Sequence, residues 1–250
     1  MIVEELLETV KDDLRGKRAT DVRIGLRYTG VLLEDQRLGV SRSFGEEAIE
    51  CCEVVDKAGE LEGDALDLAK LAVSSRAVDS SLGIASINAA LNSGIEGEEG
   101  PLLDFLEIRD GDKVGMVGNF KPVVEKIDKD IELFVFERNS QDEEIYPDWA
   151  VEQILPQVDV SIITGTSVVN KTIDHLIELS SNAREIAILG PTTPLAPEVF
   201  RMRGVSLLGG MVVEDSEKAM KIISQGGGTR KLGKVSRKVS IDLSDNNYFY

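Results

Sequence analysis

The spacing of apolar and polar residues changes along the first part of the chain. Residues 2–14 carry apolar side chains three and four positions apart, which predicts an amphipathic helix. In residues 21–28 the two kinds of position alternate, as in a half-buried strand, and 31–33 and 38–41 continue as strands around a polar turn at 34–37. These segments together predict a small antiparallel sheet.

Helical spacing follows these strands. The expected helices are residues 45–57, 65–77 and 82–91. Asp79, Ser80 and Ser81 precede the last of them and are expected to cap it. Strands followed by helices are typical of an α+β unit. Glycine and glutamate are then frequent in residues 92–101, as in a linker, so we predict a first domain over residues 1–97.

Beyond this linker, short β-branched runs alternate with helical segments. The expected strands are 113–117, 131–136, 160–164, 185–189 and 205–208, with an edge strand at 238–243. The expected helices lie near 122–127, 149–155, 168–179, 197–203 and 216–224. This alternation predicts a parallel sheet with helices on both faces, a Rossmann-like α/β domain over residues 98–250.

Composition restricts the partners of such a protein. The chain has 250 residues and a net charge of −17, which argues against nucleic acid or an anionic membrane as a partner. It has no apolar run of about 18 residues and no secretory signal pattern, so we expect a cytoplasmic protein. The adjacent Cys51 and Cys52 fit a reducing compartment, and they lack the spacing of zinc ligands.

Four expected strand ends are rich in glycine and small polar residues. They contain Gly118 and Asn119; Thr164, Gly165, Thr166, Ser167 and Asn170; Gly190, Pro191, Thr192 and Thr193; and Gly209 and Gly210. The carboxyl ends of parallel strands lie along one edge of a sheet, where ligands bind. Each loop alone also suits an ordinary turn, with Thr166 or Ser167 as a helix cap. Because the four share this character and are nearly uncharged, we predict that together they bind a ligand.

Asn88 is a polar residue within an otherwise small and apolar helical stretch. Two interpretations stay open for it. A buried asparagine can bond to backbone groups, as most buried polar side chains do. Alternatively, Asn88 faces a cleft between the two domains and belongs to the ligand site.

No cofactor or catalytic group is assigned by these patterns. Glu137 lies about 20 residues beyond Gly115, where a ribose-binding acid would fall, but the G-x-G-x-x-G fingerprint is missing. NAD or NADP is therefore the weaker interpretation, and Lys121 has the wrong spacing for a phosphate loop. The lone His175, in mid-helix, suits a surface or packing role and argues against a Ser-His-Asp system. Glu137, Lys121 and Asp148 remain unranked candidates for acid–base chemistry.

Several motifs resemble the family described as "putative heavy-metal chelation". They are G-I-A-S-I-N-A-A at 83–90, V-G-M-V-G-N-F-K-P at 114–122, I-I-T-G-T-S-V-V-N-K-T at 162–172 and L-G-P-T-T-P-L-A-P at 189–197. The resemblance implies a domain like the N-terminal domain of enolase, followed by a Rossmann-like domain, with a ligand cleft between them. One histidine and two adjacent cysteines cannot build a closed Cys/His cage, so we expect no metal ligands in the chain.

The leading functional hypothesis is a protein that binds a small polar or anionic molecule in the interdomain cleft. The resemblance suggests a metal chelator or its precursor as that molecule. Two alternatives stay open: an enzyme acting on a nucleotide-like or phosphorylated small molecule, and a non-catalytic interaction module. Homo-oligomerisation is also open, because three aromatic residues near the end of the chain could dock on a neighbour.

Overall fold

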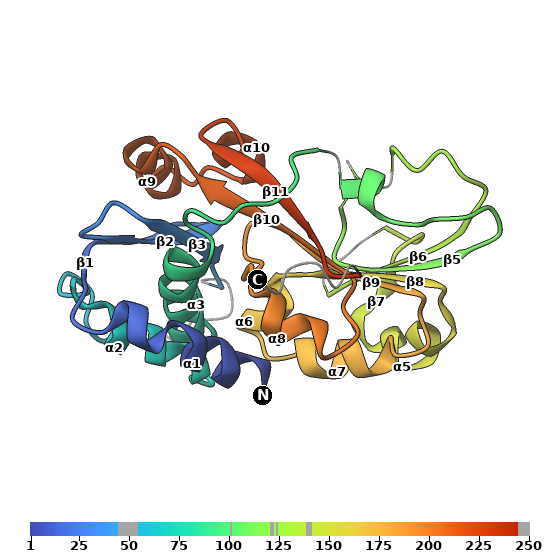
Figure 1. Ribbon diagram of the computed structural model, residues 1–250, viewed down its shortest axis with the longest axis horizontal. Helices are drawn as coiled ribbons and strands as arrows, with labels where there is room; N and C mark the ends of the chain where they lie inside the picture. Colours follow the sequence, from blue (N-terminus) through green and yellow to red (C-terminus); the bar gives the residue numbers. More distant parts are fainter. Residues whose placement is uncertain (45–54, 101, 121–122, 124, 139–141, 245–250) are drawn as a thin grey trace.

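The structure is a computed structural model with two sheets, each carrying its own helices (Figure 1). It describes residues 1–44, 55–100, 102–120, 123, 125–138 and 142–244. The predicted helix at 45–57 lies mostly outside this part, as do Cys51, Cys52 and Lys121, and residues 55–57 are not helical. One sheet has four strands and the other has seven, which confirms the predicted two-part α/β fold class.

In the described residues, the N-terminal unit consists of the four-stranded sheet, three α-helices and one 3₁₀ helix. Its strands are β1 (Arg18–Ile24), β2 (Tyr28–Leu33), β3 (Leu38–Arg42) and β4 (Gly63–Asp64), in the antiparallel order β3-β2-β1-β4. Its helical segments are α1 (Ile2–Leu14), α2 (Ala65–Lys70), η2 (Leu71–Val73) and α3 (Ala77–Leu91). The apolar face of α1 is buried, as its spacing predicts. The alternating run at 21–28 is not one strand, because it turns after Ile24 and Tyr28 begins β2.

Helix α3 is the centre of the N-terminal unit and is buried on all sides. A helix that is apolar all round must be covered all round. The predicted cap at Asp79, Ser80 and Ser81 is wrong, because the helix begins at Ala77 and the two serines lie inside it, fully buried. Ser80 Oγ donates to the carbonyl of Val169 at 2.8 Å, so this hydroxyl connects α3 to the other unit instead.

The C-terminal unit is built on the seven-stranded sheet. Its strands are β5 (Lys113–Val117), β6 (Glu132–Glu137), β7 (Tyr146–Pro147), β8 (Val160–Thr164), β9 (Glu185–Leu189), β10 (Leu207–Val213) and β11 (Ser236–Asp242). The order is β11-β10-β9-β8-β5-β6-β7, parallel except for β11. From β5 the chain proceeds to β6 and β7 on one side, and then to β8, β9 and β10 on the other. The topological switch point therefore lies between β5 and β8.

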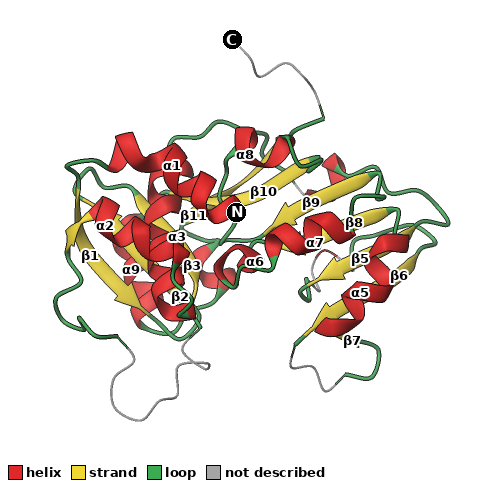
Figure 2. Ribbon diagram, turned by 90° about the horizontal axis from the view of Figure 1, so that it is seen from below, coloured by secondary structure: helices red, strands yellow, loops and turns green. Residues whose placement is uncertain are grey.

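Helices α5 (Val151–Ile154), α6 (Thr166–Val169), α7 (Ile173–Leu179) and α8 (Pro197–Arg201) lie together on one side of this sheet (Figure 1 and Figure 2). The short helices η3 (Leu102–Phe105), η4 (Asp148–Ala150) and η5 (Leu155–Gln157) belong to its connections. Helices α9 (Ser216–Ser224) and α10 (Thr229–Leu232) follow β10 and contact each other. The single helix predicted at 168–179 is two helices, because Lys171 adopts a left-handed conformation with φ 66° between them. The predicted helix near 122–127 falls partly outside the described residues.

Strand β10 extends beyond the predicted strand at 205–208. Gly209 and Gly210 pair with Ser240 and Val239 of β11, so the prediction that these glycines follow a strand end is wrong. Strand β11 is antiparallel to β10 and pairs with it from Leu207 to Val213, so both glycines lie within the strand. A Cβ on Gly210 would lie 2.8 Å from the side chain of Leu195, so the glycine permits close packing there.

Helix α9, which follows β10 of the C-terminal unit, packs against the N-terminal unit. This helix covers the face of the four-stranded sheet opposite α3 (Figure 1). One apolar cluster contains buried residues of both units. Its members are Tyr28, Leu38, Val40, Met211, Ala219, Met220, Ile223 and Leu232. The four-stranded sheet is therefore covered on both faces, on one by α3 and on the other by α9. The domain boundary between residues 97 and 98 stays a prediction.

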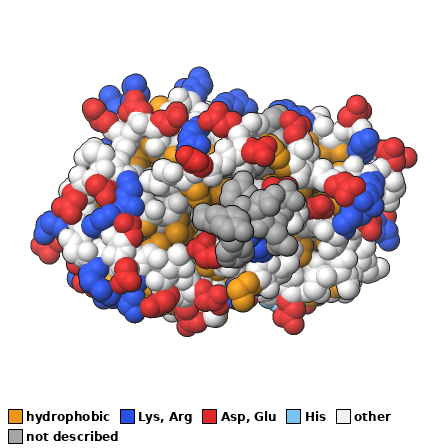
Figure 3. Space-filling view, viewed as in Figure 1, with side chains coloured by type: hydrophobic (Ala, Val, Ile, Leu, Met, Phe, Trp, Pro, Cys, Tyr) orange, Lys and Arg blue, Asp and Glu red, His pale blue; other side chains and the backbone are white. Residues whose placement is uncertain are grey.

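The described surface mixes charges of both signs. Figure 3 shows acidic and basic side chains interspersed over one face of the molecule. Within the described part of the chain, no helix is both long enough and apolar enough to cross a membrane.

Candidate functional site

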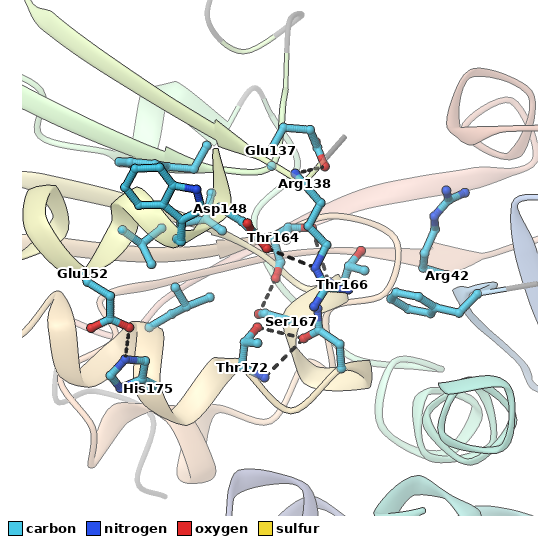
Figure 4. Close-up of a pocket in the computed structure, with 18 of the residues that line it drawn as sticks. Arg42, Glu137, Arg138, Asp148, Glu152, Thr164, Thr166, Ser167, Thr172 and His175 are labelled. Carbon is cyan, nitrogen blue, oxygen red and sulfur yellow. Dashed lines mark hydrogen bonds and ion pairs between the residues drawn. The ribbon is translucent and has the colours of Figure 1, made fainter. Parts of the chain in front are cut away.

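A cavity of ≈ 430 Å³ lies at the switch point of the seven-stranded sheet (Figure 4). Its walls come from the carboxyl ends of β5, β6 and β8, from η4 and α5, and from α6 and α7. A further wall, Arg42–Phe44, comes from the end of β3 in the N-terminal unit. The volume is within the range of small-molecule sites, which occur at switch points and between domains.

The turn after β8 forms the centre of the cavity wall. Thr164 organises it, since its hydroxyl accepts a bond from Thr166 N at 3.3 Å and its carbonyl accepts one from Ser167 Oγ at 2.6 Å. The predicted helix cap by Thr166 or Ser167 is wrong, because Gly165 occupies the N-cap position of α6. A Cβ on Gly165 would lie 2.6 Å from Thr193 N, so only glycine fits against the neighbouring loop.

The segment between α6 and α7 lines the cavity and also holds the N-terminal unit. Asn170 Oδ1 accepts bonds from Thr172 N at 3.2 Å and Thr172 Oγ1 at 2.7 Å, and both residues line the cavity. Lys171 lies between them, and its Nζ donates to Ala72 O at 2.5 Å, to Val169 O at 2.9 Å and to the Ser80 hydroxyl. Burial lowers the pKa of the Lys171 amine to about 8.

Glu137 is the last residue of β6 and lies on the rim of the cavity (Figure 4). Its Oε2 accepts a bond from Asn119 N at 3.2 Å, and its Oε1 accepts one from Arg138 N at 3.3 Å. These backbone donors orient the carboxylate. Arg138 Nε lies 3.3 Å from Asp148 Oδ2, so the arginine connects the ends of two neighbouring strands.

The side of the cavity away from Arg42 carries the pair His175 and Glu152, and Trp149 also lines the cavity. His175 Nε2 lies 2.7 Å from Glu152 Oε1, and both side chains are exposed. This agrees with the predicted surface position of His175. Trp149 is 66% exposed. A large ring in that position is available to a ligand.

Arg42 supplies positive charge from the N-terminal unit. Its backbone is fixed on both sides, since its N–H donates to Thr192 Oγ1 at 2.9 Å and its carbonyl accepts from Ser81 Oγ at 2.6 Å. Its guanidinium donates to the carbonyl of Arg27 at 3.2 Å. Among the described residues, no carboxylate forms an ion pair with Arg42. Figure 4 shows it beyond Thr166, on the side away from Glu152 and His175.

Part of the predicted site lines this cavity. These residues are Gly118, Thr164, Thr166, Ser167 and Asn170. Gly165 and Asn119 are adjacent to them in the chain but do not line the cavity. The residues that sequence reasoning missed include Arg42, Phe44, Trp149 and Glu152. No local pattern marks Arg42 or Phe44, because they reach the cavity only through the contact between the units.

A second group of predicted residues joins the units instead. Asn88 Nδ2 donates to Val40 O at 2.9 Å and to Thr192 O at 3.0 Å, so it is a buried asparagine bonded to backbone. Thr193 O accepts a bond from Asn92 Nδ2 at 2.9 Å. Thr192 and Thr193 are buried at this contact. Gly190 and Pro191 begin the same loop and do not line the cavity.

The described side chains contain no group of three or more His, Cys, Asp or Glu residues that could hold a metal ion. The cavity instead offers hydroxyl groups, a side-chain amide, two arginines, three carboxylates, an imidazole and three aromatic rings. These groups suit recognition of a polar organic molecule.

Fold and cavity together define a two-unit α/β protein with a small-molecule-sized cavity at the switch point. Comparison with protein families also identifies the family. Residues 7–91 match the DUF4213 model and residues 101–242 match the DUF364 model, both described as "Putative heavy-metal chelation". The chain belongs to this family, as its motifs predict.

Three relatives match this chain over nearly its whole length. An uncharacterised protein of Methanocaldococcus jannaschii is 27% identical over 258 residues, which cover 97% of this chain and 98% of the relative. A DUF364-family protein of unknown function from Pyrococcus horikoshii has a crystal structure that matches with a TM-score of 0.86 at 27% identity, over 97% of this chain and all of that one. A DUF364-family structure from Desulfitobacterium hafniense matches with a TM-score of 0.78 at 27% identity, over 96% and 98% of the two chains.

Proposed function

We propose that this protein binds a small polar, anionic molecule in the cavity between its two units, and that this molecule is a metal chelator or its precursor. The observation that carries the proposal is the position of Arg42. It places a guanidinium without a carboxylate partner among the described residues on one wall of a cavity whose other wall presents hydroxyl and amide groups. Guanidinium groups recognise carboxylates and phosphates through paired hydrogen bonds.

The opposite wall completes the proposed anion site. Thr164 and Thr166 place hydroxyl groups on it, and Asn170 adds a side-chain amide. Ser167 also lines it, but its hydroxyl already donates to Thr164 O. Hydroxyl groups can donate to an anion without adding charge, so Arg42 supplies the positive charge on this side of the cavity, away from Glu152 and His175. The fixed backbone of Arg42 means that little ordering is needed when the ligand enters.

The family description supports a role connected with metals, and the side chains favour an indirect one. The described residues hold no cluster of metal ligands, so the protein would bind the chelating molecule and not the bare ion. Chelators rich in carboxylate or phosphate oxygens are anionic and would fit beside Arg42. No catalytic step is included in this proposal.

Thermal unfolding in the presence of simple anions tests the proposal. Citrate, which is both an anion and a chelator, and inorganic phosphate are the probes, with zinc chloride as the metal alone. A ligand at 100 times its dissociation constant adds about 2.7 kcal/mol, which raises Tm by roughly 5–10 °C for a chain of this size. We expect citrate or phosphate to raise Tm and zinc alone to leave it unchanged.

The variant Arg42→Ala should abolish the shift. Arg27→Ala is the matched control, because Arg27 is a nearby exposed arginine whose side chain does not line the cavity. Thr166→Val should weaken the shift without changing its sign. An anion shift that persists undiminished in Arg42→Ala, or no shift with either anion, would contradict the proposal.

A further inference from the structure

The strand order places Glu137 at a position with a known use in sheets of this kind. Counted from the first strand, the order β7-β6-β5-β8-β9-β10 is 3-2-1-4-5-6, that of the doubly wound dinucleotide-binding sheet. There, an acid at the end of the second strand holds the ribose hydroxyls. Glu137 ends the second strand, β6. Gly118 N donates to Phe136 O at 2.9 Å, so the turn after the first strand contacts this strand end.

The Glu137 carboxylate is held in place and still has capacity for hydrogen bonds. Each of its oxygens accepts one long bond from a backbone N–H, at 3.2 and 3.3 Å. A carboxylate has about four acceptor sites in all, so each oxygen can accept one more donor. Two oxygens, each with one free acceptor site, match the two hydroxyl groups of a vicinal diol.

Trp149 lies next to the end of the neighbouring strand. Glu137 pairs with Pro147 of β7 in register, and Trp149 follows Pro147 by two residues. Its ring lines the cavity with 66% of the residue exposed. Nucleobases stack on exposed aromatic rings of this kind. An acceptor for a diol and a surface for a planar ring therefore occur at adjacent strand ends.

We propose that this side of the cavity binds a nucleoside, with its ribose 2′,3′-diol on Glu137 and its base against Trp149. The inference rests on the proposed function, because both use one cavity. Gly118, with φ +93° and no side chain, lets the ligand approach the turn after β5. The G-x-G-x-x-G turn of dinucleotide sites is absent, so the ligand has one nucleoside. Arg42, which lines the same cavity, is available to an anionic 5′ substituent.

Fluorescence of the full-length protein tests this directly, because Trp149 is the single tryptophan of the chain. The probes are adenosine, guanosine, cytidine and uridine, each with its 2′-deoxy counterpart. We expect at least one ribonucleoside to change the emission saturably, and its 2′-deoxy counterpart to bind on the order of tenfold more weakly. That ratio corresponds to the loss of one hydrogen bond to a charged acceptor.

Variants of the same strand complete the test. Glu137→Gln should weaken binding of the ribonucleoside on the order of tenfold and remove the preference over the 2′-deoxy form. Glu132→Gln is the matched control, since Glu132 is an exposed carboxylate at the opposite end of β6. The inference is overturned if no ribonucleoside binds, if the 2′-deoxy form binds equally well to the wild type, or if Glu137→Gln keeps the preference.

The two proposals fail separately. Anion-induced thermal shifts that depend on Arg42, without any binding of ribonucleosides, would leave the proposed function standing and overturn the nucleoside assignment. The absence of both responses would overturn both. The comparison of ribo- and deoxyribonucleosides on the wild type needs no variant, so an unfolded Glu137→Gln protein does not weaken the test.

Discussion

At the level of single residues, two asparagines one helical turn apart, Asn88 and Asn92, form hydrogen bonds between the two units. Asn88 lies in α3 and Asn92 is its C-cap residue, so both side chains are on the same side of the helix, since positions four apart are neighbours on a helix surface. Asn92 donates to Thr193 O and accepts from Leu195 N, both at 2.9 Å and both buried. Side-chain amides thereby satisfy backbone groups of a loop that would otherwise be buried without partners.

Replacement of Asn92 should destabilise the protein. Asn92→Ala leaves a buried carbonyl and a buried N–H without partners, which costs about 2–4 kcal/mol. Urea unfolding measures this free energy. The control is Asn182→Ala, which removes one exposed bond to Pro156 O and should change stability by about 0.5 kcal/mol or less. Equal effects of the two substitutions would contradict the role given to Asn92.

Lys171 predicts a dependence of stability on pH. Its pKa is about 8 in the folded protein and 10.5 ordinarily. Between these values the unfolded chain holds a proton that the folded chain has released, so the free energy of unfolding rises with pH in this interval. Below about pH 8 both states are protonated and the contribution of Lys171 to the slope is zero.

Urea unfolding across this interval, compared between the wild type and Lys171→Met, tests the assignment. The rise with pH should be smaller in the variant, whatever its absolute stability. Lys70→Met is the control, because Lys70 is exposed and its pKa is raised by Asp67. Parallel curves for the wild type and Lys171→Met would show that this amine is not the responsible group.

Single residues of the site were only partly predictable from the sequence. Thr164–Ser167 stand out because a buried strand, a glycine and a helical segment follow one another within a short stretch. Arg42 has no such signal, since its importance arises from the contact of β3 with the other unit. Thr192 and Thr193 have the composition of a binding loop, yet their neighbours in space make them part of the contact between the units.

Between elements, α3 and β3 of the N-terminal unit are in close backbone contact. A Cβ on Gly39 would lie 1.9 Å from Ala85 O and 2.2 Å from Ala89 N, so the helix backbone lies directly on the strand. Glycine at position 39 is therefore required by the approach of two backbones, which cannot move apart without disturbing the core.

Gly39→Ala should destabilise the protein by about 3 kcal/mol or more, since overpacking against backbone is not relieved by side-chain rotation. The matched control is Gly63→Ala in β4, where a Cβ would have no neighbour within 4 Å. We expect the control to be nearly neutral. Chemical unfolding of both variants measures the difference, and similar midpoints would refute the packing argument.

Elements buried on both faces were the most predictable. The strands at 113–117, 160–164 and 185–189 have the bounds that their β-branched runs indicate. Prediction failed where a partner decides the outcome. The glycines of β10 belong to a strand because β11 pairs with them. The helix predicted at 168–179 divides because Lys171 adopts a left-handed conformation and extends toward η2 and α3.

At the scale of the whole molecule, α9 completes the core of the N-terminal unit. Met220 and Ile223 approach Gly30, where a Cβ would lie 2.8 and 2.7 Å from their side chains. The predicted split at residue 97 would therefore remove one cover of the four-stranded sheet. The sequence suggested two modules through the glycine- and glutamate-rich segment at 92–101 and the change to alternating strands and helices beyond it. Long-range contacts such as those of α9 leave no periodic signal in the chain.

A fragment of residues 1–97 should not fold into a stable domain. It would expose Tyr28, Leu38 and Val40, which are buried against the C-terminal unit in the full chain. Circular dichroism during heating should show no cooperative transition for the fragment and one for the full-length protein. A cooperative transition of the fragment alone would show that α9 is dispensable for folding.

The late position of α9 also affects how the protein forms during translation. Domains of most chains can fold as soon as they leave the ribosome, the N-terminal one first. Here the first sheet emerges before the seven-stranded sheet, while the helix that covers it, α9, follows β10. Until α9 has been synthesised, one apolar face of the first sheet lacks its cover, so it is open to water or to a chaperone.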